Sequence, residues 1–212
     1  MGAAPNRPLQ IFYRDEYVTD VLEDGRRRAF DVLRPRRVRD ALVAAGLATP
    51  DEFVAAPQLG RADALLVHTP AYLDSLADPA VVARLLFLDP AGGWDERLLD
   101  PFLFASGGTL AAARSAAAGN GIGFNLGGGF HHAQADKAEG FCAIADVAIA
   151  IRALQRDGLA RRVLIVDLDC HHGNGNAEIF SADESVFTFS MHANTWCWID
   201  KQNNLDIELP SG

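Results

Sequence analysis

The strongest constraint on the fold is a helix, a buried strand and a polar cluster that follow one another directly. Apolar residues recur at helical spacing in 141–157 and form one stripe. The apolar run VLIVDL (163–168) then predicts a strand. It leads into VDLDCHHGNGN (166–176), where two aspartates and two histidines lie within six residues. Without partners these groups would cost several kcal/mol of desolvation, so the sequence predicts either a metal site or a very costly turn.

Further strands and helices alternate along the chain. The predicted strands are 9–13, 64–68, 121–125, 163–168, 186–191 and 205–209, and the predicted helices are 36–46, 106–118 and 141–157. Several strands are continuously apolar, which is typical of strands buried on both faces of a parallel sheet. The strand–helix–strand order across 121–168 predicts a βαβ unit. We therefore expect an α/β protein with a three-layer, mostly parallel sheet and helices on both faces, in a single domain over 1–212.

The charge balance and the cysteines restrict partners and location. The net charge of −9 argues against direct nucleic-acid binding and against an anionic membrane surface. No stretch has the length of a membrane span or of a signal-peptide core. Cys142, Cys170 and Cys197 are an odd number and widely spaced, which fits a reducing compartment. A soluble cytoplasmic protein is expected; the oligomeric state stays open.

Asp169 and His171 have the spacing of a metal-binding pair at the carboxyl end of a strand. Ligands of open parallel sheets bind beyond these strand ends. Alternation along an extended chain sends Asp167, Asp169 and His171 to the same side. Carboxylate and imidazole suit catalytic Zn²⁺, and Asp167 would then hold a histidine in its required tautomer.

A second polar cluster, FNLGGGFHHAQADKAEGFC (124–142), also follows a predicted strand and should open onto the same edge. Adjacent side chains diverge on an extended segment, so His131 and His132 can reach one site only if the backbone turns. The glycines of 127–129 permit that turn. A histidine pair of this kind is suited to general acid–base catalysis of hydrolysis.

These motifs together resemble the zinc-dependent histone deacetylase family of the arginase/deacetylase fold. The resemblance rests on GGGFHHA, GFC and a following aspartate in 127–146, on VDLDCHHGNG (166–175) and on FSMH (189–192), and it covers roughly residues 9–210. GGGFHHA and the asparagine of HHGNG look most like the class IV branch and its bacterial relatives.

The resemblance implies roles for individual residues. Asp169 and His171 resemble two of three zinc ligands, with Fe²⁺ as an alternative metal. His131 and His132 resemble the catalytic pair that handles the protons of the attacking water and the leaving amine. Asp167 matches the carboxylate that orients His131.

Further positions match the family less directly. Asn174 stands where many relatives have an aspartate behind His132, and a neutral amide would raise that ring's basicity less. Gly129 and Phe141 resemble the lining of an acyl-lysine tunnel. A monovalent cation, K⁺, is implied at the set Asp167, Asp169, His171, Ser190 and Met191.

The resemblance also leaves parts of the family pattern unmatched. Its third zinc ligand, an aspartate, its oxyanion-stabilising residue, usually tyrosine, and its last glycine-rich loop fall after the point where this chain ends. The fold is thus expected to be incomplete at its C-terminal side, as the N-terminal part of the catalytic domain. We expect little or no deacetylase activity from the 212 residues alone.

Three functions remain open on this basis. The first is a metal-dependent amidohydrolase acting on acylated lysine, an acylated polyamine or a related amide. The second is a two-manganese ureohydrolase of the same fold, which would have an aspartate where this chain has Gly173. The third is a catalytically incompetent fragment or acyl-lysine-binding module that keeps the fold.

Overall fold

The structure is a computed structural model that describes residues 9–18, 31–193 and 203–210. Within these ranges, every helix is too short or too polar to cross a membrane. Of the three cysteines, Cys142 is buried, Cys170 is exposed, and Cys197 lies outside the described residues.

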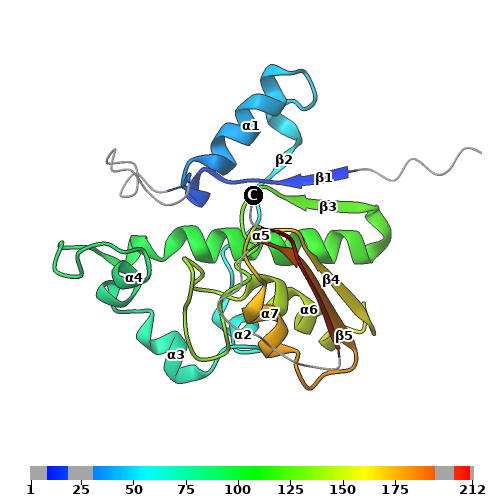
Figure 1. The fold of residues 1–212 in the computed structure, drawn as a ribbon. Coiled ribbons are helices and arrows are strands. Elements are labelled where there is room, and N and C mark those ends of the chain that lie inside the picture. The colour runs from blue at the N-terminus through cyan, green and yellow to red at the C-terminus, as the bar shows by residue number, and fades with distance from the viewer. Residues whose placement is uncertain (1–8, 19–30, 194–202, 211–212) are drawn as a thin grey trace, which may run out of the picture.

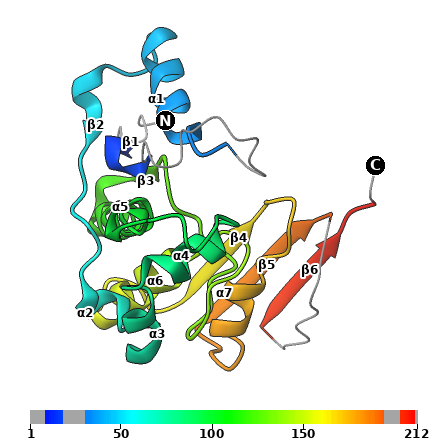
Figure 2. The ribbon, with the colours of Figure 1, turned by 90° about the vertical axis from the view of Figure 1, so that its left-hand side faces the viewer.

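The described strands form two parallel sheets of three strands each. The first has the order β2-β1-β3 and consists of β1 (Leu9–Phe12), β2 (Phe53–Val54) and β3 (Ile122–Asn125). The second has the order β4-β5-β6 and consists of β4 (Val163–Asp167), β5 (Val186–His192) and β6 (Asn204–Glu208). Figure 2 shows β4, β5 and β6 side by side.

Helices pack against both sheets. They are α1 (Arg34–Ala44), α2 (Arg61–Ala64), α3 (Pro70–Ser75), α4 (Pro79–Leu85), α5 (Asp100–Ser115), α6 (Asp146–Arg156) and α7 (Asn174–Ile179), with a π-helical turn at Ala116–Asn120 and single 3₁₀ turns at Asp15–Tyr17, Pro50–Glu52 and Glu96–Leu98. The long α5 lies beneath β1 and β3 and packs against α6 on its other side (Figures 1 and 2).

The apolar stripe of α6 forms the centre of the core, as its spacing predicts. Ala148 and Ile151 of that stripe are buried together with Ile149 of the same helix, and Ile144 is buried in the loop just before α6. Phe180, just after α7, is also fully buried and packs in the same cluster as Ile151. Burial of this apolar area holds the second sheet against α6 and α7.

The strand predicted at 64–68 is wrong. Its first residue ends α2, and the N–H of His68 donates to the carbonyl of Ala64 over 2.9 Å, as in a helical turn. Ala64 and His68 are both buried, whereas Leu65 is 42 % exposed. Burial four residues apart is the period of a helix, and a short apolar run does not reveal which period applies.

The helices predicted at 36–46, 106–118 and 141–157 exist with different bounds. α1 ends before Gly46, whose φ of 67° fits the predicted cap, and α5 begins six residues earlier than expected. α6 begins only at Asp146, because Gly140 and Phe141 have φ values of 53° and 64°. This left-handed backbone cannot continue a helix, so 141–145 forms part of the loop before α6.

The strands are not buried on both faces within the described part of the chain. On β4, Ile165 is buried under α6 and α7, whereas Leu164 and Val166 are 60 % and 55 % exposed, because no described element covers their side. The predicted βαβ unit across 121–168 is also corrected: β3 and β4 lie in different sheets. Two pairs of parallel neighbours are joined through a helix in the chain: β1 and β2 through α1, and β4 and β5 through α7.

Candidate active site

Glycine residues and a buried carboxylate shape the loop that carries the histidine pair. Gly128 and Gly129 follow β3 with φ values of 79° and 77°, which favour glycine. Asp146, at the start of α6, accepts the N–H groups of Gly129 and Phe130, each over 2.8 Å. A Cβ at Gly128 would lie 2.3 Å from this carboxylate. The loop therefore turns tightly and delivers two consecutive histidines to one place.

Asp146 is the last residue of the 127–146 motif, and the sequence alone assigned it no role. Its side chain is 1 % exposed and also accepts from the Thr109 hydroxyl over 2.6 Å. Burial raises the pKa of this carboxyl, and the three donors act against that rise. An aspartate that begins an apolar helix stripe was the available signal, because a charge at that position needs buried partners.

Each ring of the histidine pair has a hydrogen-bond partner at its Nδ1 atom. The Nδ1 atom of His131 lies 2.6 Å from Oδ2 of Asp167, and Nδ1 of His132 lies 2.6 Å from Oδ1 of Asn174. The ring centroids are 4.0 Å apart. Because carboxylate and amide oxygens only accept, both Nδ1 atoms donate and the opposite ring nitrogens can accept a proton.

Asp169 and His171 lie beside this pair. Oδ1 of Asp169 is 3.2 Å from Nδ1 of His171 and 3.9 Å from Nε2 of His131. Two ligands of a tetrahedral zinc ion at about 2.0–2.1 Å would be roughly 3.3 Å apart, so the donor pair fits zinc. Within the described ranges, no group of three potential metal-binding side chains is present. Asp169 and His171 thus provide two donors at a suitable separation, and metal binding by them stays a prediction.

The predicted cation-binding residues come together at paired strand ends. Asp167 of β4 is the register partner of Ser190 in β5, and Met191 follows directly. The Ser190 hydroxyl is 2.9 Å from Nδ1 of His192. Binding of K⁺ here stays a prediction.

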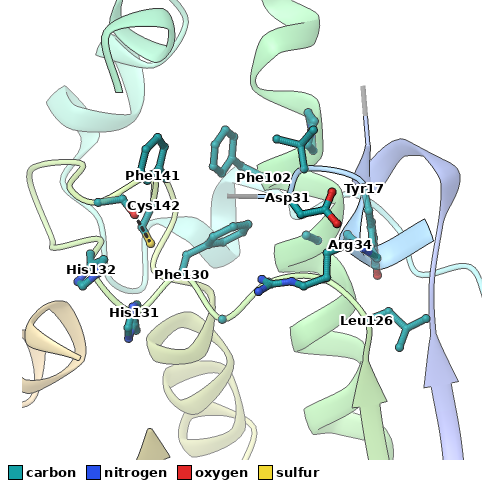
Figure 3. Close-up of a pocket in the computed structure, with 18 of the residues that line it drawn as sticks. Tyr17, Asp31, Arg34, Phe102, Leu126, Phe130, His131, His132, Phe141 and Cys142 are labelled. Carbon is teal, nitrogen blue, oxygen red and sulfur yellow. Dashed lines mark hydrogen bonds between the residues drawn. The ribbon is translucent and has the colours of Figure 1, made fainter. Parts of the chain in front are cut away.

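One cavity of about 580 Å³ is lined by six of the predicted site residues (Figure 3), whereas Asp167, Asn174, Ser190 and Met191 are outside its lining. Its lining includes both histidines of the pair and both predicted metal ligands, together with the two predicted substrate-binding residues Gly129 and Phe141. Phe102 and Phe130 lie 5.2 Å apart by ring centroid and add an aromatic wall. The site is therefore a largely apolar pocket with a cluster of ionisable groups.

The protonation of His132 and Asp169 is set by their surroundings. Burial, together with the charge of His131, lowers the pKa of His132 to about 4. Burial acts to raise the pKa of Asp169, but the N–H of His171 and the neighbouring imidazoles outweigh it and hold that pKa below its ordinary value. At neutral pH the site therefore combines a neutral imidazole with a carboxylate.

Buried neutral histidines predict a loss of stability in mild acid. In the unfolded chain His132 binds a proton below its ordinary pKa of about 6.5. In the folded chain it binds a proton only near pH 4. The free energy of unfolding should therefore fall by up to about 3 kcal/mol from pH 7 to pH 4 through this group. Burial lowers the pKa of His68 as well, which adds to the same trend.

Urea unfolding at several pH values measures this effect. His132→Gln should show a shallower decline between pH 6.5 and pH 4.5 than the wild-type chain. Equal declines in the two proteins would contradict the assignment of a buried neutral His132.

The fold and the site define a class of protein: an α/β protein with an imidazole pair and a carboxylate–imidazole pair at the carboxyl ends of parallel strands. The histone deacetylase domain model matches residues 29–198. The chain belongs to the histone deacetylase family.

Curated relatives agree with this membership. An uncharacterised protein of Picosynechococcus is 38 % identical over 208 residues, which is 95 % of this chain and 66 % of the relative. Histone deacetylase 2 of Arabidopsis thaliana is 33 % identical over 89 % of this chain and 50 % of its own length. The acetoin utilization protein AcuC of Staphylococcus aureus is 32 % identical over 77 % of this chain and 44 % of its own length. The chain thus spans about half to two thirds of these relatives.

Solved structures show the same fold. The HDA15 HD domain has a TM-score of 0.79 at 23 % identity and is 63 % covered, while 96 % of this chain matches. A histone deacetylase homologue in complex with SAHA has a TM-score of 0.67 at 26 % identity, covering 85 % of this chain and 53 % of that one. The expected arginase/deacetylase-like α/β fold is confirmed, with this chain matching part of its neighbours.

Proposed function

We propose that the protein is a metal-dependent deacylase that hydrolyses the amide of an acylated lysine or a related acylated amine. One observation carries the proposal: His131, His132, Asp169 and His171 all line the same cavity. Both rings of the histidine pair are hydrogen-bonded at Nδ1, and Asp169 lies 3.2 Å from His171. Membership of the histone deacetylase family supports the same reaction class.

Asp169 and His171 would hold the metal, and zinc is proposed because a carboxylate and an imidazole suit it, with Fe²⁺ as the alternative. The bound ion would supply Lewis acidity toward the amide carbonyl. The N–H of His171 donates to Oδ1 of Asp169 over 2.8 Å, which fixes the carboxylate beside the imidazole.

The histidine pair would move the protons. His132 is neutral at physiological pH and can accept a proton from the attacking water at Nε2. His131 is held at Nδ1 by the Asp167 carboxylate and would donate a proton to the leaving amine. Because the rings are only 4.0 Å apart, positive charge on one disfavours positive charge on the other, so the pair would carry at most one positive charge at a time.

The substrate would enter along the phenylalanine side chains that line the cavity. Phe141 and Phe130 offer flat apolar surfaces to the methylenes of a lysine or polyamine, and Gly129 leaves room for close approach. The net charge of −9 favours cationic substrates through long-range attraction.

A non-catalytic acyl-lysine-binding module is the second candidate, since the described part of the chain contains no group of three potential metal-binding side chains. The ureohydrolase hypothesis is weaker, because Gly173 stands at the position of that class's additional aspartate.

The test measures hydrolysis of an acetyl-lysine peptide and of an acetylated polyamine by the complete gene product loaded with zinc. We expect chelator-sensitive release of acetate from at least one substrate. His131→Gln should lower kcat by about 10²–10⁴-fold, because it removes proton transfer. The matched control is His68→Gln, a buried histidine outside the cavity lining, which should retain most of the activity.

Turnover unaffected by chelation, or equal loss in both variants, would contradict the proposed mechanism. Peptide binding without turnover by the complete product would instead establish the binding module.

A further inference from the structure

A glutamate stands behind the asparagine that orients His132. Nδ2 of Asn174 donates to Oε2 of Glu139 over 3.0 Å, while Oδ1 of the same amide accepts from Nδ1 of His132 over 2.6 Å. Asn174 and His132 are 1 % and 3 % exposed. We propose that Glu139 is a positioning residue that fixes the amide of Asn174 and thereby the Nδ1–H tautomer of His132. The catalytic meaning of this tautomer rests on the proposed function.

The two ends of the Asn174 amide have opposite hydrogen-bonding roles: the oxygen accepts and the NH₂ group donates. If the Asn174 amide turned over, its NH₂ group would face Nδ1 of His132, which would then have to accept. The ring proton would move to Nε2, and the ring could no longer take a proton from water at that atom. Asparagine alone does not choose between these arrangements.

Glu139 makes the choice because a carboxylate only accepts. It holds the NH₂ end of the amide and leaves the oxygen to His132. The turned-over amide would set its oxygen against the carboxylate, which is repulsive in a buried site. Gln134 also donates to Oε2 of Glu139 over 3.2 Å and helps to fix the carboxylate.

The loop backbone holds Glu139 in this place. The N–H of Cys142 donates to the Glu139 carbonyl over 2.8 Å, and the N–H of Glu139 donates back over 3.3 Å. Gly140, between them, packs so closely on His132 that a Cβ would lie 2.2 Å from the ring. The same loop therefore places Phe141 in the cavity lining and Glu139 behind the ring.

Glu139 and Asn174 divide the task of a single carboxylate. The Asn174 amide oxygen accepts the hydrogen bond from Nδ1–H of His132. The negative charge lies behind it, on the Glu139 carboxylate that accepts from the Asn174 NH₂ group. Burial and the charge of His131 lower the pKa of His132, and the charge of Glu139 acts in the opposite direction. A carboxylate at 174 would therefore make Glu139 unnecessary, and the two together would repel.

The test reads the tautomer of His132 by NMR in the 212-residue chain with ¹⁵N-labelled histidine. The chain has six histidines, and the His132 signals are those missing in His132→Gln. At pH 7.5 the wild type should show Nδ1–H. Glu139→Gln should raise the Nε2–H population about tenfold, the effect of losing one hydrogen bond to a charged group. The control is Glu178→Gln, an exposed glutamate on α7, which should change nothing.

A second variant keeps the inference testable. Asn174→Asp combined with Glu139→Gln should restore the Nδ1–H form, because the carboxylate then accepts from His132 directly. An unchanged tautomer in Glu139→Gln, or no rescue in the double variant, would overturn the inference.

These outcomes are separate from the fate of the proposed function, since the tautomer is read without turnover. If the complete product hydrolyses acyl-lysine and Glu139→Gln leaves the tautomer unchanged, the inference fails and the function stands. If Glu139→Gln shifts the tautomer but the wild-type complete product does not hydrolyse acyl-lysine, the inference stands and the proposed function fails.

Discussion

Asp146→Ala is expected to lower the free energy of unfolding by about 3–5 kcal/mol, because it removes a buried carboxylate that is the shared acceptor of two N–H groups and one hydroxyl. The carboxylate is 1 % exposed and accepts from Gly129, Phe130 and the Thr109 hydroxyl at 2.6–2.8 Å. Each unsatisfied buried donor costs about 1–3 kcal/mol, and the lost side chain leaves a cavity as well. Asp146→Asn keeps one acceptor oxygen, so about half of this loss is expected.

Urea denaturation followed by circular dichroism measures the effect. The matched control is Asp136→Ala, an exposed aspartate in the same loop, which should change stability by less than about 0.5 kcal/mol. If Asp146→Ala were no more destabilising than Asp136→Ala, the carboxylate would not be what holds the glycine turn.

Asp169→Ala is expected to weaken zinc binding by at least about 100-fold. Loss of a residue that merely supports a ligand already costs about 10–100-fold, and Asp169 is proposed to be a ligand itself. In the structure its Oδ1 lies 3.2 Å from Nδ1 of His171, the separation that two zinc ligands require. With only one donor of the pair left, the ion would be held mainly by water.

A competition titration against a chromophoric chelator measures the affinity and the stoichiometry. The wild-type chain should bind one zinc ion, and zinc should raise its melting temperature because the ion binds the folded state. Asp136→Ala serves again as the control with unchanged binding. Equally weak binding by the wild type and Asp169→Ala would show that these two donors do not form a metal site by themselves.

Five of the six predicted strands exist and both polar clusters follow strands as predicted, whereas 64–68 is not a strand and the short β2 was not predicted. Runs such as 163–167 and 186–192 are β-rich, apolar and bounded by turn residues, and they form β4 and β5. A polar cluster at the end of such a strand has few physical explanations, so His131 and Asp169 could be singled out before any contact was known.

The tertiary structure alone decided where local signals were ambiguous or absent. The apolar run at 64–68 became a helical turn because burial falls on Ala64 and His68, four residues apart. The start of α6 was set by the left-handed backbone at Phe141. Neither choice is visible in composition, since short apolar runs suit both kinds of element.

The contacts of the site are likewise non-local. Asp146 reaches Gly129 across 17 residues, and Asn174 reaches Glu139 across 35. The residue types at these positions are ordinary, and only the packing of α6 and α7 on the second sheet brings them together. The type of a residue determines which interactions its side chain can make. The partner that it actually contacts depends on which distant segment packs against it in the folded chain.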